Sequence, residues 1–76
     1  MPYFVYALQS EKDGRLYIGM TRDVQKRLSQ HNAGKTQSTR FYRPYVLLRF
    51  AEVPNRLAAR ALEKEWKSGS GRASIK

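Results

Sequence analysis

Two tyrosines near the start of the chain, Tyr6 and Tyr17, lie in segments whose composition is typical of β-strands. These segments are residues 3–9 and 15–20, and Asp13-Gly14 between them is the dipeptide expected in a tight hairpin turn. If the hairpin points both side chains the same way, the two hydroxyls can reach one shared ligand. The chemistry of the pair therefore depends on how the two strands are aligned.

The length of the hairpin loop decides that alignment. A two-residue loop places Ser10 opposite Tyr17. A four-residue loop places Leu8 there instead, with Tyr6 on the diagonal about 7 to 8 Å away. Both registers keep the tyrosines and Gly19 on one face, whereas a three- or five-residue loop would separate the tyrosines. Because glycine has no side chain, Gly19 would leave a gap for a phosphate; the alternative is two ordinary strand tyrosines with Gly19 in a bulge.

Arg27 and His31 follow on a predicted helix that begins after Thr21 or Asp23 and ends near Asn32. Val24 and Leu28 form its apolar stripe; His31 falls between them in angle, and Arg27 lies about 60° from Val24. Arg22, Lys26, Ser29 and Gln30 occupy the opposite, solvated side. Two interpretations of Arg27 are open. Its alkyl stem can pack on the apolar surface, above a buried His31, while its guanidinium reaches water. Alternatively, the guanidinium points across the sheet at a phosphate.

Glu63 and Glu65 lie on a second predicted helix, which starts at Pro54-Asn55 and runs to about Lys67. The apolar face of this helix consists of Ala58, Ala59, Leu62 and Trp66. The two carboxylates border opposite edges of that face, so helical geometry cannot choose between them. Either could hold Mg²⁺, which is bound by one or two carboxylates together with substrate phosphates. The alternative is a surface ion pair of Glu63 with Lys67 or Arg60.

A third strand is predicted over residues 45–53, preceded by a polar loop over residues 33–44. The order β-β-α-β-α predicts an α+β fold in which a small antiparallel sheet is covered by helices. With no linker or repeat, we expect residues 1–76 to form a single domain.

Positive charge is the strongest global feature, with 15 Lys and Arg against 6 Asp and Glu and a net charge of +9. This excess favours a nucleic-acid partner. The candidate cations for binding nucleic acid lie in the predicted loop over residues 33–44, where Lys35, Arg40 and Arg43 are interleaved with aromatic residues. Arg72 follows a glycine-rich turn that could form an anion-binding nest or simply end the helix.

The absence of cysteine is consistent with a reducing cytoplasm and excludes disulfides and thiolate zinc sites. The longest apolar run is too short for a membrane span, and charged residues follow it too soon for a signal peptide. A protein that lies on a lipid surface is poorly supported, because no predicted helix has a face of bulky apolar residues. We therefore expect a soluble cytoplasmic protein.

Taken together, these residues resemble the GIY-YIG nuclease domain, and in particular its small stand-alone bacterial members. Tyr17-Ile18-Gly19 is the second triplet, and Phe4-Val5-Tyr6 stands in place of the first with its tyrosine kept. Arg27 and His31 match the phosphate-facing arginine of the family and the polar residue one turn later. Glu63 matches the metal-binding glutamate, and the resemblance thereby selects it over Glu65.

The resemblance implies a three-stranded antiparallel sheet flanked by helices, with the two tyrosines, Arg27 and the glutamate converging on one Mg²⁺ or Mn²⁺ ion. It implies an endonuclease that hydrolyses DNA phosphodiester bonds in repair or recombination. The sequence leaves open whether the DNA partner is branched or single-stranded, and it does not exclude RNA. Tyr17 is the first candidate for the general base and His31 the second. Met20 replaces a lysine of the excision-repair members, and the C-terminal segment lacks the asparagine of larger family nucleases. A nucleic-acid-binding module without cleavage is the alternative.

Overall fold

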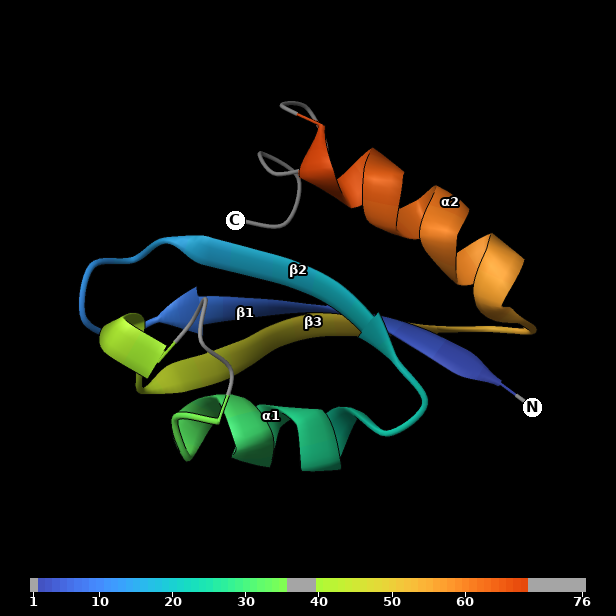
Figure 1. Cartoon of the computed structure of the whole chain (residues 1–76). Helices are drawn as coiled ribbons and strands as arrows, with labels where there is room; N and C mark the ends of the chain where they lie inside the picture. Colours follow the sequence, from blue (N-terminus) through green and yellow to red (C-terminus); the bar gives the residue numbers. More distant parts are fainter. Residues whose placement is uncertain (1, 36–39, 69–76) are drawn as a thin grey trace.

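The computed structural model describes residues 2–35 and 40–68. Its elements are, in chain order, β1 (Tyr3–Ser10), β2 (Leu16–Thr21), α1 (Val24–Asn32), the short 3₁₀ helix η1 (Arg40–Tyr42), β3 (Tyr45–Val53) and α2 (Arg56–Lys67). The strands form one antiparallel sheet in the order β2-β1-β3, with α1 and α2 on opposite faces (Figure 1). The predicted α+β fold with the order β-β-α-β-α is thus confirmed, and η1 is the element that the sequence did not predict.

Both helices begin at side chains that cap their free backbone N–H groups. Asp23 accepts a hydrogen bond from the backbone N–H of Lys26 at 3.0 Å, and Asn55 does the same for Ala58 at 2.9 Å. The first helix therefore starts after Asp23, the second of the two caps that the sequence allowed. At the other end of α1, the side chain of Asn32 pairs with both backbone groups of Tyr45, which joins the helix to the start of β3.

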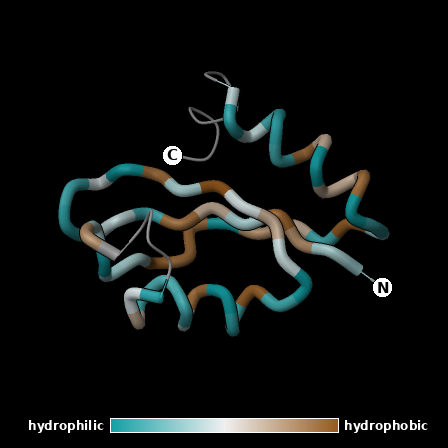
Figure 2. The backbone as a smooth tube through the Cα atoms, viewed as in Figure 1, coloured by the Kyte–Doolittle hydropathy of each residue, from teal (hydrophilic) through white to brown (hydrophobic). Residues whose placement is uncertain are grey.

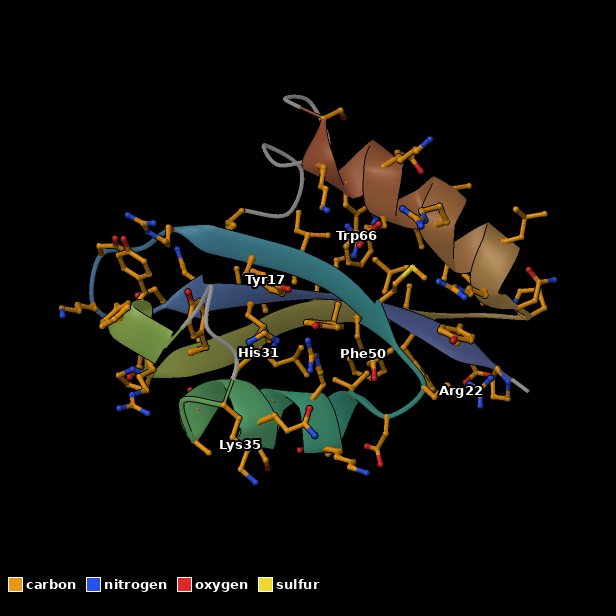
Figure 3. All side chains as sticks on the ribbon, viewed as in Figure 1. Tyr17, Arg22, His31, Lys35, Phe50 and Trp66 are labelled. Carbon is orange, nitrogen blue, oxygen red and sulfur yellow. The ribbon has the colours of Figure 1, made fainter. Side chains whose placement is uncertain are left out.

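The sheet separates two cores. Val5, Ala7 and Ile18 face α2 and pack against Ala59 and Trp66, as the predicted apolar face of that helix required. On the opposite face, Tyr6, Leu8 and Tyr45 are buried, with Tyr17, Val24 and Leu28 packed against them. Figure 2 shows the hydrophobic residues along the strands and a hydrophilic hairpin turn, and Figure 3 shows Trp66 between α2 and the sheet.

The hairpin between β1 and β2 uses the longer of the two registers considered. Leu8 pairs with Tyr17 and Tyr6 with Gly19, so the alignment with Ser10 opposite Tyr17 is wrong. The Ser10 hydroxyl accepts hydrogen bonds from the backbone N–H groups of Lys12 and Asp13, which stabilises the wider turn. Because both registers have the same parity, the tyrosines still lie on one face of the sheet.

Candidate active site

Tyr6 lies on the central strand and extends its ring across Gly19 of the neighbouring strand β2. A Cβ atom built on Gly19 would lie 2.6 Å from the Tyr6 hydroxyl oxygen and 2.8 Å from Cζ. Gly19 is itself buried, and its conformation does not require glycine, since its φ is not positive. The expected gap for a phosphate over Gly19 is therefore wrong, because the Tyr6 ring fills that space. The glycine is needed so that Tyr6 can lie flat over the edge strand.

Tyr17 lies beside this ring, on the same face of the sheet. The ring centroids of Tyr6 and Tyr17 are 6.3 Å apart, consistent with the diagonal pairing of the longer register. Tyr6 is buried, with 2% of its surface exposed, whereas Tyr17 is half-buried. Of the two predicted tyrosines, Tyr17 is thus the more accessible to a ligand.

His31 is fully buried behind the tyrosines, with 0% of its surface exposed. Its Nε2 lies 3.2 Å from the Tyr6 hydroxyl, and its ring centroid lies 4.8 Å from that of Tyr17. Figure 3 shows His31 between α1 and the sheet. Burial and the nearby charge of Arg27 lower the pKa of His31 to about 4, so the imidazole is neutral at physiological pH. A neutral, buried ring is suited to holding Tyr6 in place rather than to touching a substrate.

Arg27 joins the two tyrosines from α1. The pKa of its guanidinium is raised chiefly by a hydrogen bond to Tyr6, and Tyr17 contributes through its charge and a further hydrogen bond. The guanidinium also donates to the Gln30 side chain at 3.0 Å. Gln30 was expected on the solvated side of the helix and is instead half-buried, because Arg27 binds its amide oxygen. Three residues on one helix and two on the hairpin thus form one polar cluster.

Glu63 lies on α2, the helix on the other face of the sheet, and its charge contributes to the pKa of Tyr6. Burial raises the pKa of Tyr6, and the negative charges of Tyr17 and Glu63 raise it further, whereas Arg27 lowers it. Because α2 packs against β2 and β2 is an edge strand, we infer that Glu63 acts on Tyr6 around the open edge of the sheet. Its side chain is 14% exposed and lies 3.7 Å from Lys67, the ion pair considered from the sequence. Glu65, in contrast, is exposed.

A cleft of about 500 Å³ opens next to Arg27, at the end of β2. Its polar lining includes Arg22, Lys26, Arg27 and Arg56, and its apolar lining includes Tyr3 and Met20. The sequence identified neither the cleft nor Arg56 as part of a site. Helical periodicity assigned Arg22 and Lys26 to solvent, and only the packed structure brings Arg56 of α2 close to the start of α1.

Two of the predicted loop cations, Lys35 and Arg43, are separate from this cluster. Lys35 and Arg43 are exposed, and the Arg43 guanidinium packs against Gly34. Figure 3 shows Lys35 on the side of α1 that faces away from the sheet. No contact within residues 2–35 and 40–68 links either side chain to the tyrosines. Arg72 and the side chain of Arg40 lie outside the described residues, so their binding roles remain predictions.

Two tyrosines on adjacent antiparallel strands, an arginine on the following helix and a glutamate on the last one are arranged in the order that the resemblance to GIY-YIG domains implied. Residues 2–76 match the family model described as the GIY-YIG catalytic domain, and the chain belongs to this family, which is one of nucleases. Within the described residues, no helix is long and apolar enough to cross a membrane.

More specifically, the chain is similar to UPF0213 proteins. It is 40% identical to one from Streptococcus sanguinis over 95% of this chain and 83% of the relative. It is also 40% identical to one from Nitratidesulfovibrio vulgaris over 80% of this chain, and that match spans only 56% of the relative's length. The solution NMR structure of a UPF0213 protein from Bacillus halodurans matches with a TM-score of 0.60 and 32% identity, covering 99% of this chain and 82% of that one.

Proposed function

We propose that this protein is a divalent-metal-dependent endonuclease that hydrolyses DNA phosphodiester bonds. The observation that carries the proposal is that Tyr6 and Tyr17 lie on one face of the sheet with ring centroids 6.3 Å apart, beside Arg27, whose pKa both tyrosines raise. The charge of Glu63 makes a smaller contribution to the raised pKa of Tyr6. A guanidinium binds a phosphate through paired N–H donors. The cluster therefore offers a cation that can bind a phosphate and two hydroxyls that can hold or move a proton, with the charge of Glu63 reaching Tyr6 from α2.

The residues present fit a metal ion that is shared with the substrate. Within residues 2–35 and 40–68, no group of three or more His, Cys, Asp or Glu side chains could hold a metal ion. Mg²⁺ and Mn²⁺ are hard ions, and Mg²⁺ is commonly held by one or two carboxylates together with water and substrate phosphates. Glu63 would be that carboxylate. Bound there, the ion would stabilise the negative charge that develops on the leaving oxygen.

The chain's own groups divide the remaining work. Arg27 holds the phosphate and stabilises the charge that builds up on it. Tyr17 is half-buried, and in its phenolate form, with Arg27 stabilising the charge on its oxygen, it takes the proton of the attacking water. The water oxygen then bonds to phosphorus as the P–O bond to the leaving sugar oxygen breaks, and that oxygen takes a proton from solvent water. Tyr6 has a raised pKa and stays protonated, so its hydroxyl serves as a fixed hydrogen-bonding group. His31 positions Tyr6 and does not contact the substrate.

A nicking assay on Tyr17→Phe tests this assignment. Loss of a general base costs about 10²- to 10⁴-fold in rate, so we expect a loss in that range with Mg²⁺ or Mn²⁺. Tyr45→Phe is a matched control, because Tyr45 is a buried tyrosine of the same core that contacts neither Arg27 nor Glu63 among the described interactions. Full activity of Tyr17→Phe would refute the role of the tyrosine as base.

The alternative function is nucleic-acid binding without cleavage. The specific observation in its favour is that Lys67 already pairs with Glu63, the single carboxylate of the cluster. The Glu63–Lys67 pair is long and Lys67 is half-exposed, so the pair stabilises the fold by at most a few tenths of a kcal/mol, as is typical of such helix pairs. A metal ion can therefore displace Lys67 from Glu63. DNA binding that survives Glu63→Gln, with no nicking by the wild type under any divalent ion, would favour the binding module.

A further inference from the structure

The cleft at the end of β2 is a second candidate site for a phosphate. Arg22 is in the loop after β2, Lys26 is in the first turns of α1 and Arg56 is the first residue of α2. All three side chains are exposed and line the cleft. Three elements distant in sequence therefore place their cations around one hollow, which indicates a binding surface rather than a solvated helix face (Figure 3 marks Arg22).

The cations of the cleft lining outnumber its carboxylates. Within residues 2–35 and 40–68, the ion pairs are Arg15 with Asp13 and Lys67 with Glu63. Asp23 is the acidic residue in the cleft lining, and its Oδ1 already accepts the backbone N–H of Lys26 at the start of α1. The cleft therefore keeps an unbalanced positive charge, which favours an anionic ligand.

Arg27 connects the cleft to the tyrosine cluster, because it lines the cleft and lies near enough to Tyr6 and Tyr17 for both to raise its pKa. The ligand that fits both places is a chain of phosphates. Tyr3 and Met20 add an apolar floor, with the Arg22 guanidinium carbon 5.5 Å from the centroid of the Tyr3 ring. Such a surface suits the sugar between two backbone phosphates.

We propose that Arg22, Lys26 and Arg56 bind a nucleic-acid backbone phosphate that neighbours the one held by Arg27. The strand then crosses the open edge of β2, between the starts of α1 and α2. This inference rests on the proposed function, since Arg27 marks the scissile phosphate only if the protein is a nuclease. It adds the path of the strand and three contact residues that neither the periodicity nor the family match assigned.

The test measures affinity for fluorescein-labelled DNA by anisotropy, with EDTA present and NaCl varied, so that no cleavage occurs. Each lost phosphate contact lowers the slope of log K against log salt by about 0.7 to 0.9 and weakens binding about five- to eightfold at 0.1 M salt. We expect this loss for Lys26→Gln, and likewise for Arg22→Gln and Arg56→Gln. Lys12→Gln is the matched control, because Lys12 is an exposed lysine in the hairpin turn, at the opposite end of β2.

The outcomes separate the two proposals. Equal slopes for Lys26→Gln and Lys12→Gln would overturn the cleft site while leaving the endonuclease intact. Reduced slopes for the cleft variants, with no nicking by the wild type, would support the cleft and refute the endonuclease. Absence of DNA binding by the wild type would overturn both. Thermal melting of each variant shows whether it is folded, and we expect these exposed substitutions to change stability little.

Discussion

Gly19→Ala is the substitution whose effect follows most directly from the geometry. The added methyl group would lie 2.6 Å from the Tyr6 hydroxyl oxygen and 3.2 Å from Cε1. Tyr6 is 2% exposed and hydrogen-bonded to His31, so its rigid ring cannot move away without losing that contact. Overpacking of this kind costs about 1 to 3 kcal/mol.

Part of that cost is offset. Alanine in a strand is better than glycine by about 0.5 to 1 kcal/mol, and Gly19 does not have a positive φ that would forbid a side chain. The net loss of unfolding free energy therefore lies between about 0 and 2.5 kcal/mol, with a central value of about 1 kcal/mol. For a chain of this size, each kcal/mol lowers the melting temperature by about 4 to 8 °C. Thermal melting followed by circular dichroism measures the shift.

The matched experiment is the same substitution in a Tyr6→Phe background. Removing the hydroxyl removes the shortest contact, although Cζ remains at 2.8 Å, so the penalty should fall without vanishing. Contacting residues couple by about 0.5 to 3 kcal/mol in such cycles. Wild-type stability of Gly19→Ala, combined with weaker DNA binding, would contradict this account and restore the phosphate gap that the sequence first suggested.

Three further results are expected. His31 binds a proton near pH 6.5 in the unfolded chain but only near pH 4 in the folded one, so the unfolding free energy should fall by up to about 3 kcal/mol as the pH drops through that interval. Urea titrations from pH 7 to 4 measure this loss, and His31→Phe should abolish that part of the pH dependence. Asn32→Ala leaves both backbone groups of Tyr45 without their side-chain partner and should cost about 1 to 3 kcal/mol in urea unfolding, whereas an unchanged midpoint would show that the clamp is dispensable. Arg27→Lys loses the forked donor and should slow nicking at least tenfold while the melting temperature changes less than in Gly19→Ala; equal nicking would remove Arg27 from the phosphate site.

Features encoded by neighbouring residues were predictable from the sequence. Asp23 and Asn55 define the starts of both helices because a cap depends on residues within one turn. The shared face of Tyr6 and Tyr17 was predictable because it depends only on the parity of the hairpin. The register itself was not, since Asp13-Gly14 suits a two-residue loop and the hydrogen bonds that Ser10 accepts decide for the wider turn.

Features that depend on packing between distant segments were not predictable. The role of Gly19 depends on the direction that the Tyr6 ring takes across the neighbouring strand. The cleft depends on Arg22 and Arg56, which are brought together only when both helices pack on the sheet. Helical geometry left Glu63 and Glu65 equivalent, and the resemblance to a family was needed to choose between them. In the structure, Glu63 is the carboxylate whose charge acts on Tyr6.

Nicking of supercoiled plasmid by Glu63→Gln and Glu65→Gln tests the central claim most directly. The two variants carry the same substitution two positions apart on α2, but Glu63 is half-buried and its charge helps to raise the pKa of Tyr6, whereas Glu65 is exposed. With Mg²⁺ or Mn²⁺, we expect Glu63→Gln to lose at least about 10²-fold in rate, as for removal of one transition-state charge partner. Glu65→Gln should cut at the wild-type rate. Equal activity of the two variants, or no metal-dependent nicking by the wild type, would contradict the proposal.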